Sequence, residues 1–80
     1  MSKKTPVVSG KQLLSLLQKF DYAVVRQRGS HVRLEKITEA GIHKITIPYH
    51  DPIAKGTLSD IIKKIAIWNQ ISKEKLIDLL

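Results

Sequence analysis

The fold is decided by residues 22–47, which read YAVVRQRGSHVRLEKITEAGIHKITI. Three runs rich in strand-forming residues, at 22–28, 31–37 and 42–47, are separated by Gly29-Ser30 and by a turn-like segment at 38–41. Pro48 ends the third run, because proline has no backbone N–H to offer a strand ladder. Short turns between consecutive strands predict a three-stranded antiparallel sheet.

Alternation along the three runs assigns the side chains to two faces, since successive strand residues point to opposite sides of a sheet. In the first run Ala23 and Val25 oppose Val24. We expect an apolar face, able to pack on helices, made of Val25, Val32, Leu34, Ile45 and Ile47. We expect the solvated face to present Arg26, Arg28, His31, Arg33 and Lys44. One covered and one solvated face is usual for an antiparallel sheet.

Helical periodicity flanks the sheet segment on both sides. Ser9 is a good N-cap for a first helix with an apolar stripe at Leu13, Leu16, Leu17 and Phe20. After a loop at 48–56, Thr57 and Asp60 resemble a capping box before a stripe of Leu58, Ile61, Ile62, Ile65 and Trp68, and Ser72 precedes a short terminal helix. Residues 1–8 are expected to form a loose arm. The prediction is one α+β domain over 1–80, in the order α-β-β-β-α with helices on one face and a short C-terminal helix.

Composition limits the kinds of function open to the chain. Eighty residues bury only about 60% of the surface of the unfolded chain, so a functional site should lie on an open face. The 14 Lys and Arg against 7 Asp and Glu leave a net charge of +7, typical of proteins that meet polyanions. The positive charge is concentrated in residues 1–44, and all three arginines lie between Arg26 and Arg33.

Several classes of protein are excluded or disfavoured by the same inventory. The chain has no cysteine, which excludes disulfide scaffolds, thiol catalysis and cysteine-ligated metal centres. Neither a signal-peptide stretch nor an apolar run of membrane-spanning length occurs, so we expect a cytoplasmic protein with no membrane partner. His31, His43 and His50 lack the spacing of a metal site, and we expect neither a metal nor a small-molecule cofactor.

His31 is the residue most able to carry chemistry. It follows Gly29-Ser30 and is expected on the basic face, where a histidine could act as general base on an RNA 2′-OH while arginine or lysine stabilises a phosphorane. Gly29 would let a nucleic-acid backbone approach closely. Position and charge alone also allow His31 to be an ordinary surface residue and Gly29 to mark a β-bulge.

The other candidate residues carry weaker signals. His50 follows the third strand and could orient a phosphate, act as a second acid or base, or simply pair with Asp51 in a turn. Lys55, at a helix start, could hold an anion, or the Lys55–Thr57 segment could be only a turn before a cap. His43 is expected to be structural. Core packing is expected for Phe20 and Trp68, whereas Tyr22 and Tyr49 border the sheet and could stack on a base.

Three blocks in this order resemble the HicA (YcfA-like) toxins, the mRNA interferases of HicA–HicB toxin–antitoxin pairs. They are VRQRGSHVRL at 25–34, IPYH at 47–50 and KGTL at 55–58, and the resemblance covers about 6–79. It implies a double-stranded-RNA-binding-like fold and cleavage of mRNA, with His31 as catalytic residue and Gly29 associated with it. It also implies inhibition by a HicB-type antitoxin. Basic-face residues Ser30, Arg26, Arg28, Arg33 and Lys44, with His50 and Lys55, are the expected RNA contacts.

Two features keep other interpretations open. Family members often carry glycine where the first helix ends, whereas this chain has Phe20-Asp21-Tyr22, and Asp21 would have to adopt the left-handed conformation there. Among other functions, a non-catalytic RNA-binding module of double-stranded-RNA-binding type would use the same basic face without cutting RNA. A small protein whose basic face only meets an acidic subunit would do neither.

Overall fold

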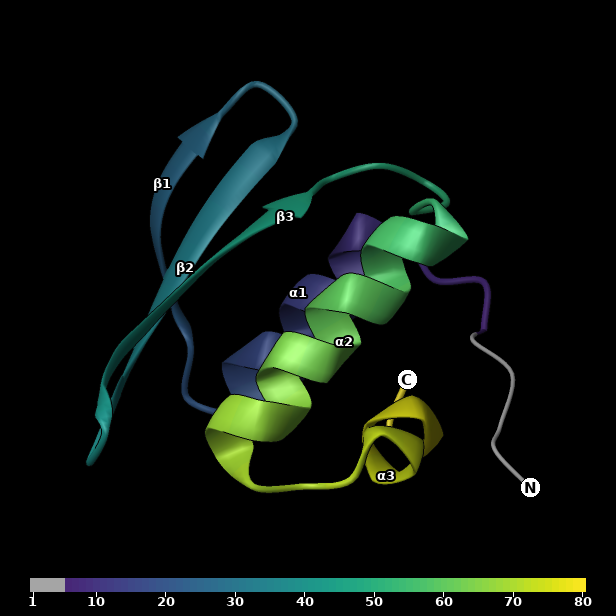
Figure 1. Ribbon diagram of the computed structural model, residues 1–80. Coiled ribbons are helices and arrows are strands. Elements are labelled where there is room, and N and C mark those ends of the chain that lie inside the picture. Colours follow the sequence, from purple (N-terminus) through teal and green to yellow (C-terminus); the bar gives the residue numbers. More distant parts are fainter. Residues whose placement is uncertain (1–5) are drawn as a thin grey trace.

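A computed structural model describes residues 6–80, and Figure 1 shows a three-stranded sheet with helices packed on one side. The elements are α1 (Gly10–Lys19), β1 (Ala23–Arg28), β2 (His31–Thr38), β3 (Gly41–Pro48), α2 (Lys55–Asn69) and α3 (Lys73–Asp78). The predicted α+β order, α-β-β-β-α followed by a short C-terminal helix, is therefore confirmed.

The core lies between the helices and one face of the sheet. The strands are antiparallel in the order β1-β2-β3, and β2 and β3 pair without interruption from His31↔Pro48 to Thr38↔Gly41. The inward side chains predicted for these two strands are buried, namely Val32, Leu34, Ile45 and Ile47. The two long helices cover them with Leu13, Leu16 and Leu17 from α1 and Leu58, Ile61, Ile62 and Ile65 from α2.

Strand β1 departs from simple alternation. Its pairing with β2 shifts between Val24↔Leu34 and Arg26↔Arg33, so Val25 is the extra residue of a β-bulge. Val24 therefore shares the helix-facing side with Leu34, and Val25, predicted to lie in the core, is 51% exposed. The whole strand is exposed, since the helices do not extend under this edge of the sheet (Figure 1).

The helix ends confirm three expectations and correct one. Ser9 caps α1 in a capping box with Gln12, and Ser72 caps α3. Asp21 has the left-handed conformation expected of it at the end of the first helix, with φ 68°. Thr57, however, is not an N-cap, because α2 begins two residues earlier, after Ala54, and its first turn has no side-chain cap. A capping-box pattern in the sequence cannot show that the helix has already started.

The segments around α1 are tied to the loop after β3. Val8, placed by the sequence in a loose arm, is 1% exposed, and its carbonyl accepts a 2.8 Å hydrogen bond from the Ile53 amide. The Gly10 amide donates to the His50 carbonyl over 2.7 Å. Burial of an apolar side chain and a backbone hydrogen bond hold this part of the chain in place. The remainder of the predicted arm, residues 1–5, lies outside the described residues.

A polar cluster lies inside the domain, at the end of the sheet away from the β1–β2 turn. The sequence left open that Tyr22, at the border of the sheet, could stack on a base, but Tyr22 is 3% exposed. Its hydroxyl lies 2.5 Å from Nδ1 of His43 and accepts a 3.1 Å hydrogen bond from the Asn69 amide. Trp68, predicted as a core residue, stacks on the His43 ring at 4.7 Å and remains partly exposed, so it covers the cluster from the solvent side.

Candidate functional site

The face of the sheet opposite the helices, called the outer face below, carries most of the predicted site residues. The pairing of β1, β2 and β3 arranges its side chains in four cross-strand rows. In order from the β1–β2 turn they are Arg28, His31 and Pro48; Arg26, Arg33 and Thr46; Ala23, Glu35 and Lys44; and Ile37 with Ile42. Successive rows are about 6.6 Å apart, the rise of two strand residues.

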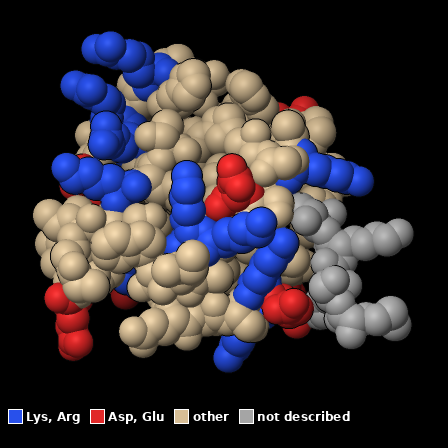
Figure 2. All heavy atoms as spheres, in the orientation of Figure 1, with Lys and Arg blue, Asp and Glu red and all other residues tan. Residues whose placement is uncertain are grey.

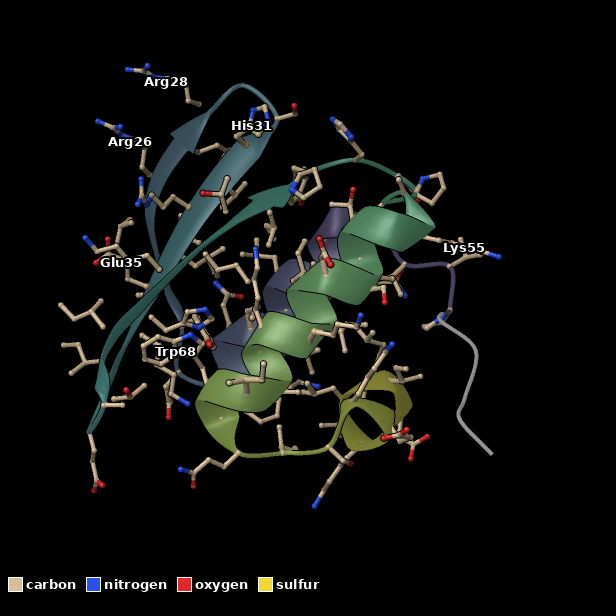
Figure 3. All side chains as sticks on the ribbon, viewed as in Figure 1. Arg26, Arg28, His31, Glu35, Lys55 and Trp68 are labelled. Atoms are coloured by element: carbon tan, nitrogen blue, oxygen red, sulfur yellow. The ribbon has the colours of Figure 1, made fainter. Side chains whose placement is uncertain are left out.

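The first two rows place one histidine beside three arginines. His31 pairs with Arg28, and the adjacent row pairs Arg26 with Arg33. Figure 3 shows Arg26 and Arg28 directed away from the helices and His31 beside the β1–β2 turn. Like charges directly opposite each other destabilise a sheet. The Arg26–Arg33 pair is therefore better suited to binding an anion than to stabilising the domain.

The imidazole of His31 is open to solvent and has no internal partner. No side chain in 6–80 makes a hydrogen bond or an ion pair with it, and its residue is exposed. A buried structural histidine would show the opposite pattern, as His43 does. His31 is thus positioned by its strand alone, with both ring nitrogens available to a bound molecule.

The turn before His31 explains the glycine of the Gly-Ser-His sequence. Arg28 and His31 are paired, so Gly29 and Ser30 form a two-residue hairpin turn, and Gly29 has φ 60°. Positive φ at the first turn position is what a type II′ hairpin needs, and glycine meets it without steric cost. A β-carbon on Gly29 would meet no atom within 4 Å, so open space remains beside His31.

On the side of His31 opposite Arg28 lies the end of β3, and the residues that follow it are hydrogen-bonded to the start of α1. Pro48 is the pairing partner of His31, and the Tyr49 amide continues the ladder with a 2.6 Å hydrogen bond to the Ser30 carbonyl. His50, which is exposed, comes next and is anchored through its carbonyl by Gly10. This chain of backbone contacts brings His50 to the same end of the sheet as His31.

Lys44 and Lys55 have different relations to this group. Lys44 lies on the outer face, but in the third row, directly opposite Glu35. Lys55 is the first residue of α2, and its side chain points away from the sheet on the far side of the helix layer (Figure 3). The structure therefore gathers Arg26, Arg28, Gly29, Ser30, His31 and Arg33 closely, with His50 and Lys44 at the margins, and does not bring Lys55 to them.

The basic side chains of the outer face are concentrated in its first two rows. In Figure 2, basic side chains cluster over the β1–β2 hairpin, at the upper left of the view. Glu35 is the one acidic residue in the four rows. A polyanion would therefore meet its most favourable potential at the two rows nearest the turn.

The inner cluster around His43 contributes to stability and stays apart from the outer face. His43 is 4% exposed, and burial, with the charges of Lys64 and Lys36, lowers its pKa. Burial likewise raises the pKa of the Tyr22 hydroxyl, an effect that the hydrogen bond from Asn69 opposes. The Tyr22 hydroxyl and Nδ1 of His43 share a hydrogen bond. The structural role predicted for His43 agrees with these contacts.

One further feature of the outer face follows from the sequence pattern, and a second feature beside the site does not. Ile37 follows His31, Arg33 and Glu35 in the same alternation, so the pattern places its side chain on the outer face. There Ile37 pairs with Ile42. Gly10 gave no such signal. A β-carbon there would lie 2.6 Å from the Tyr49 Cα, a contact between segments 39 residues apart that no local pattern reports.

Within residues 6–80 no three His, Cys, Asp or Glu side chains gather in a way that could hold a metal ion. None of the helices in the same range is long and apolar enough to cross a membrane.

Comparison with known proteins gives one match. The family model described as "HicA toxin of bacterial toxin-antitoxin" matches residues 10–67, which include all four rows of the outer face and most of α2. No curated protein and no solved structure matches the chain.

Proposed function

The chain belongs to the HicA toxins of bacterial toxin–antitoxin systems, and from this premise we propose that it is an endoribonuclease that cleaves mRNA with His31 as general base. The observation that carries the proposal is the row of Arg28 and His31 beside the row of Arg26 and Arg33 on an open face. These two rows combine a solvent-accessible base with arginines that have no stabilising role of their own.

The proposed reaction uses a nucleophile that RNA itself supplies. An imidazole nitrogen of His31 takes the proton of a ribose 2′-OH, and the 2′-oxygen forms a bond to the adjacent phosphorus. The bond from phosphorus to the 5′-oxygen of the next nucleotide then breaks. The products are a 2′,3′-cyclic phosphate and a 5′-OH end. Because the nucleophile is already attached to the substrate, no metal-activated water is needed.

Arginines of the first two rows would stabilise the reaction electrostatically. Negative charge grows on the phosphorane oxygens as the 2′-oxygen attacks, and guanidinium groups can pair with two oxygens at once. Arg28 lies opposite His31, while Arg26 and Arg33 are one row further along. We propose that Arg28 contacts the phosphate being cut and that the Arg26–Arg33 pair holds a neighbouring phosphate.

The leaving 5′-oxygen needs a proton, and two groups are candidates for the general acid that supplies it. His50 is exposed and is held at the same end of the sheet through the Gly10 hydrogen bond. Either His50 or a water molecule can supply this proton. Lys44 and Lys55 are further from the row of His31 along the sheet or behind the helices, and any RNA contacts they make would be peripheral.

A toxin of this class is paired with an antitoxin, and we propose a HicB-type protein as the partner that neutralises this chain. The open outer face has no lid of its own among the described residues. A partner laid over the arginine rows would block access to His31, and carboxylates on that partner would match the charge of the face.

The test is cleavage of a single-stranded RNA oligonucleotide by the purified protein and by its His31→Ala variant. We expect the wild type to release fragments with 2′,3′-cyclic phosphate ends, with EDTA making no difference, and the variant to lose at least about 100-fold in rate. His43→Gln serves as the matched control, because it removes a buried histidine away from the outer face. Cleavage by His31→Ala at the wild-type rate contradicts the role of His31, and salt-dependent binding without cleavage by the wild type indicates a non-catalytic RNA-binding module.

A further inference from the structure

The fourth row of the outer face has a different chemistry from the first two. Ile37 and Ile42 are directly paired across β2 and β3, and they are 85% and 52% exposed. On the other strand residues of this face, polar and charged side chains predominate. Two neighbouring isoleucines held on the solvated side of a sheet leave apolar surface in water that the domain does not use for its own packing.

RNA does not account for this pair. Single-stranded nucleic acid is bound mainly by cations that follow its backbone and by aromatic side chains on which its bases stack, and aliphatic side chains supply neither. Glu35 stands between the isoleucines and the arginine rows, and its carboxylate repels phosphate. Six residues along β2 separate Ile37 from His31, about 20 Å. The RNA-binding part of the face therefore ends before the fourth row.

We propose that Ile37 and Ile42 form the apolar anchor of the antitoxin protein, separate from the residues that bind and cut RNA. The partner that fits has an apolar side chain seated on the two isoleucines and carboxylates reaching back towards Lys44 and Arg33. Charge complementarity supports this occupant, since the two rows beyond Glu35 carry Arg26, Arg28 and Arg33 and no acidic residue. The inference rests on the proposed pairing with a HicB-type antitoxin and does not depend on RNA cleavage.

An anchor outside the catalytic rows has a functional consequence. The antitoxin can bind tightly through the isoleucines while its carboxylates cover the arginines. Substitutions in the fourth row should then release the toxin from its antitoxin without harming its activity. Substitutions in the first row should instead reduce RNA cleavage and leave the chain bound to its antitoxin.

The experiment uses calorimetry to measure how this chain binds the HicB-type protein proposed as its partner. It uses the His31→Ala protein as the parent, so that toxicity does not limit expression. Adding Ile37→Asp is expected to weaken binding by about 30-fold or more, as for a central anchor residue, and Ile42→Asp should act in the same direction. The matched control is Ile67→Asp, which changes an isoleucine of α2 that is 76% exposed on the helix side, and it should stay within about 2-fold of the parent.

Three results would overturn the proposal. The first is unchanged antitoxin binding by both Ile37→Asp and Ile42→Asp, or no complex with the parent protein. The second is a folded Ile37→Asp protein, in the His31→Ala background, that loses RNA binding as much as antitoxin binding. The third is concentration-dependent self-association of the parent that Ile37→Asp abolishes, which would make a second copy the occupant. Antitoxin binding is measured directly and does not depend on RNA cleavage. A wild type that fails to cut RNA therefore refutes the proposed reaction, and the binding test of Ile37 and Ile42 remains decisive.

Discussion

Replacing Gly10 by alanine adds one methyl group at the contact between α1 and the end of β3. The added β-carbon would lie 2.6 Å from the Tyr49 Cα, 2.9 Å from the Pro48 carbonyl oxygen and 3.1 Å from the His50 nitrogen. All three neighbours are backbone atoms. No side chain can rotate to make room, so the helix and the strand end must move apart.

The size of the effect follows from these distances. Nonbonded carbon atoms normally approach to about 3.5–4.0 Å, so the two segments must separate by about 1 Å. Overpacking of this kind costs about 1–3 kcal/mol, and it also strains the 2.7 Å hydrogen bond from Gly10 to His50. Alanine's better helix propensity returns only about 0.5–1 kcal/mol. The midpoints of these ranges leave a net loss of about 1 kcal/mol, which corresponds to a fall in Tm of about 4–8 °C for a domain of this size.

The assay is thermal unfolding followed by far-UV circular dichroism, with urea unfolding as a second measure. Gly56→Ala is the matched control, since Gly56 also lies in the first turn of a helix and its added β-carbon would meet no atom within 4 Å. We expect Gly56→Ala to raise Tm or leave it unchanged. A Gly10→Ala protein that melts at or above the wild-type temperature would refute the close contact between α1 and the residues next to His31.

Three further outcomes are expected. Because burial lowers the pKa of His43 below its ordinary value of 6.5, the unfolded chain binds more protons below about pH 6.5. Stability should therefore fall as the pH drops from that value, by up to about 1.4 kcal/mol per pH unit, and urea unfolding of His43→Gln between pH 5 and 8 should lack this component. Val8→Ala should cost about 2 kcal/mol in urea unfolding, since Val8 is buried, while the exposed Val7→Ala should change stability by less than about 0.5 kcal/mol. Arg33→Ala should reduce the slope of log K for single-stranded RNA against log salt by about 0.7, measured by fluorescence anisotropy, and an unchanged slope would mean that Arg33 makes no phosphate contact.

The parts of the fold that could be predicted depend on local periodicity. Side chains of β2 and β3 alternate without a break, so the sequence was sufficient to place His31 and Arg33 outside and Leu34 and Ile47 inside. Ser9 could be recognised as a cap because its partner Gln12 lies within one helical turn. In each case the interacting groups are a few residues apart, and a repeating pattern reports their geometry.

The features that could not be predicted depend on contacts between distant segments. Tyr22 is buried because His43 and Asn69 supply partners for its hydroxyl, from positions 21 and 47 residues away. Val8 is buried because the loop after β3 returns to it, with Ile53 donating to its carbonyl. A tyrosine at a strand end or a valine in a terminal segment is compatible with exposure or burial until the tertiary fold is known.

The bulge at Val25 shows how one unpredicted residue can determine the outer face. Continuing the pairing of Val24↔Leu34 without a shift would place Arg26 opposite Val32 and Gln27 opposite His31. Arg26 and Arg28 would then lie on the opposite side of the sheet from His31. The extra residue reverses the side of everything that follows it in β1. Arg26 pairs with Arg33 and Arg28 with His31, and the apolar Val25 is left exposed at the strand edge. An exposed valine and a cross-strand arginine pair both work against stability, and the bulge that produces them is what brings Arg26 and Arg28 onto the face that already carries His31 and Arg33. This combination is expected when a sheet face is adapted to bind a polyanion.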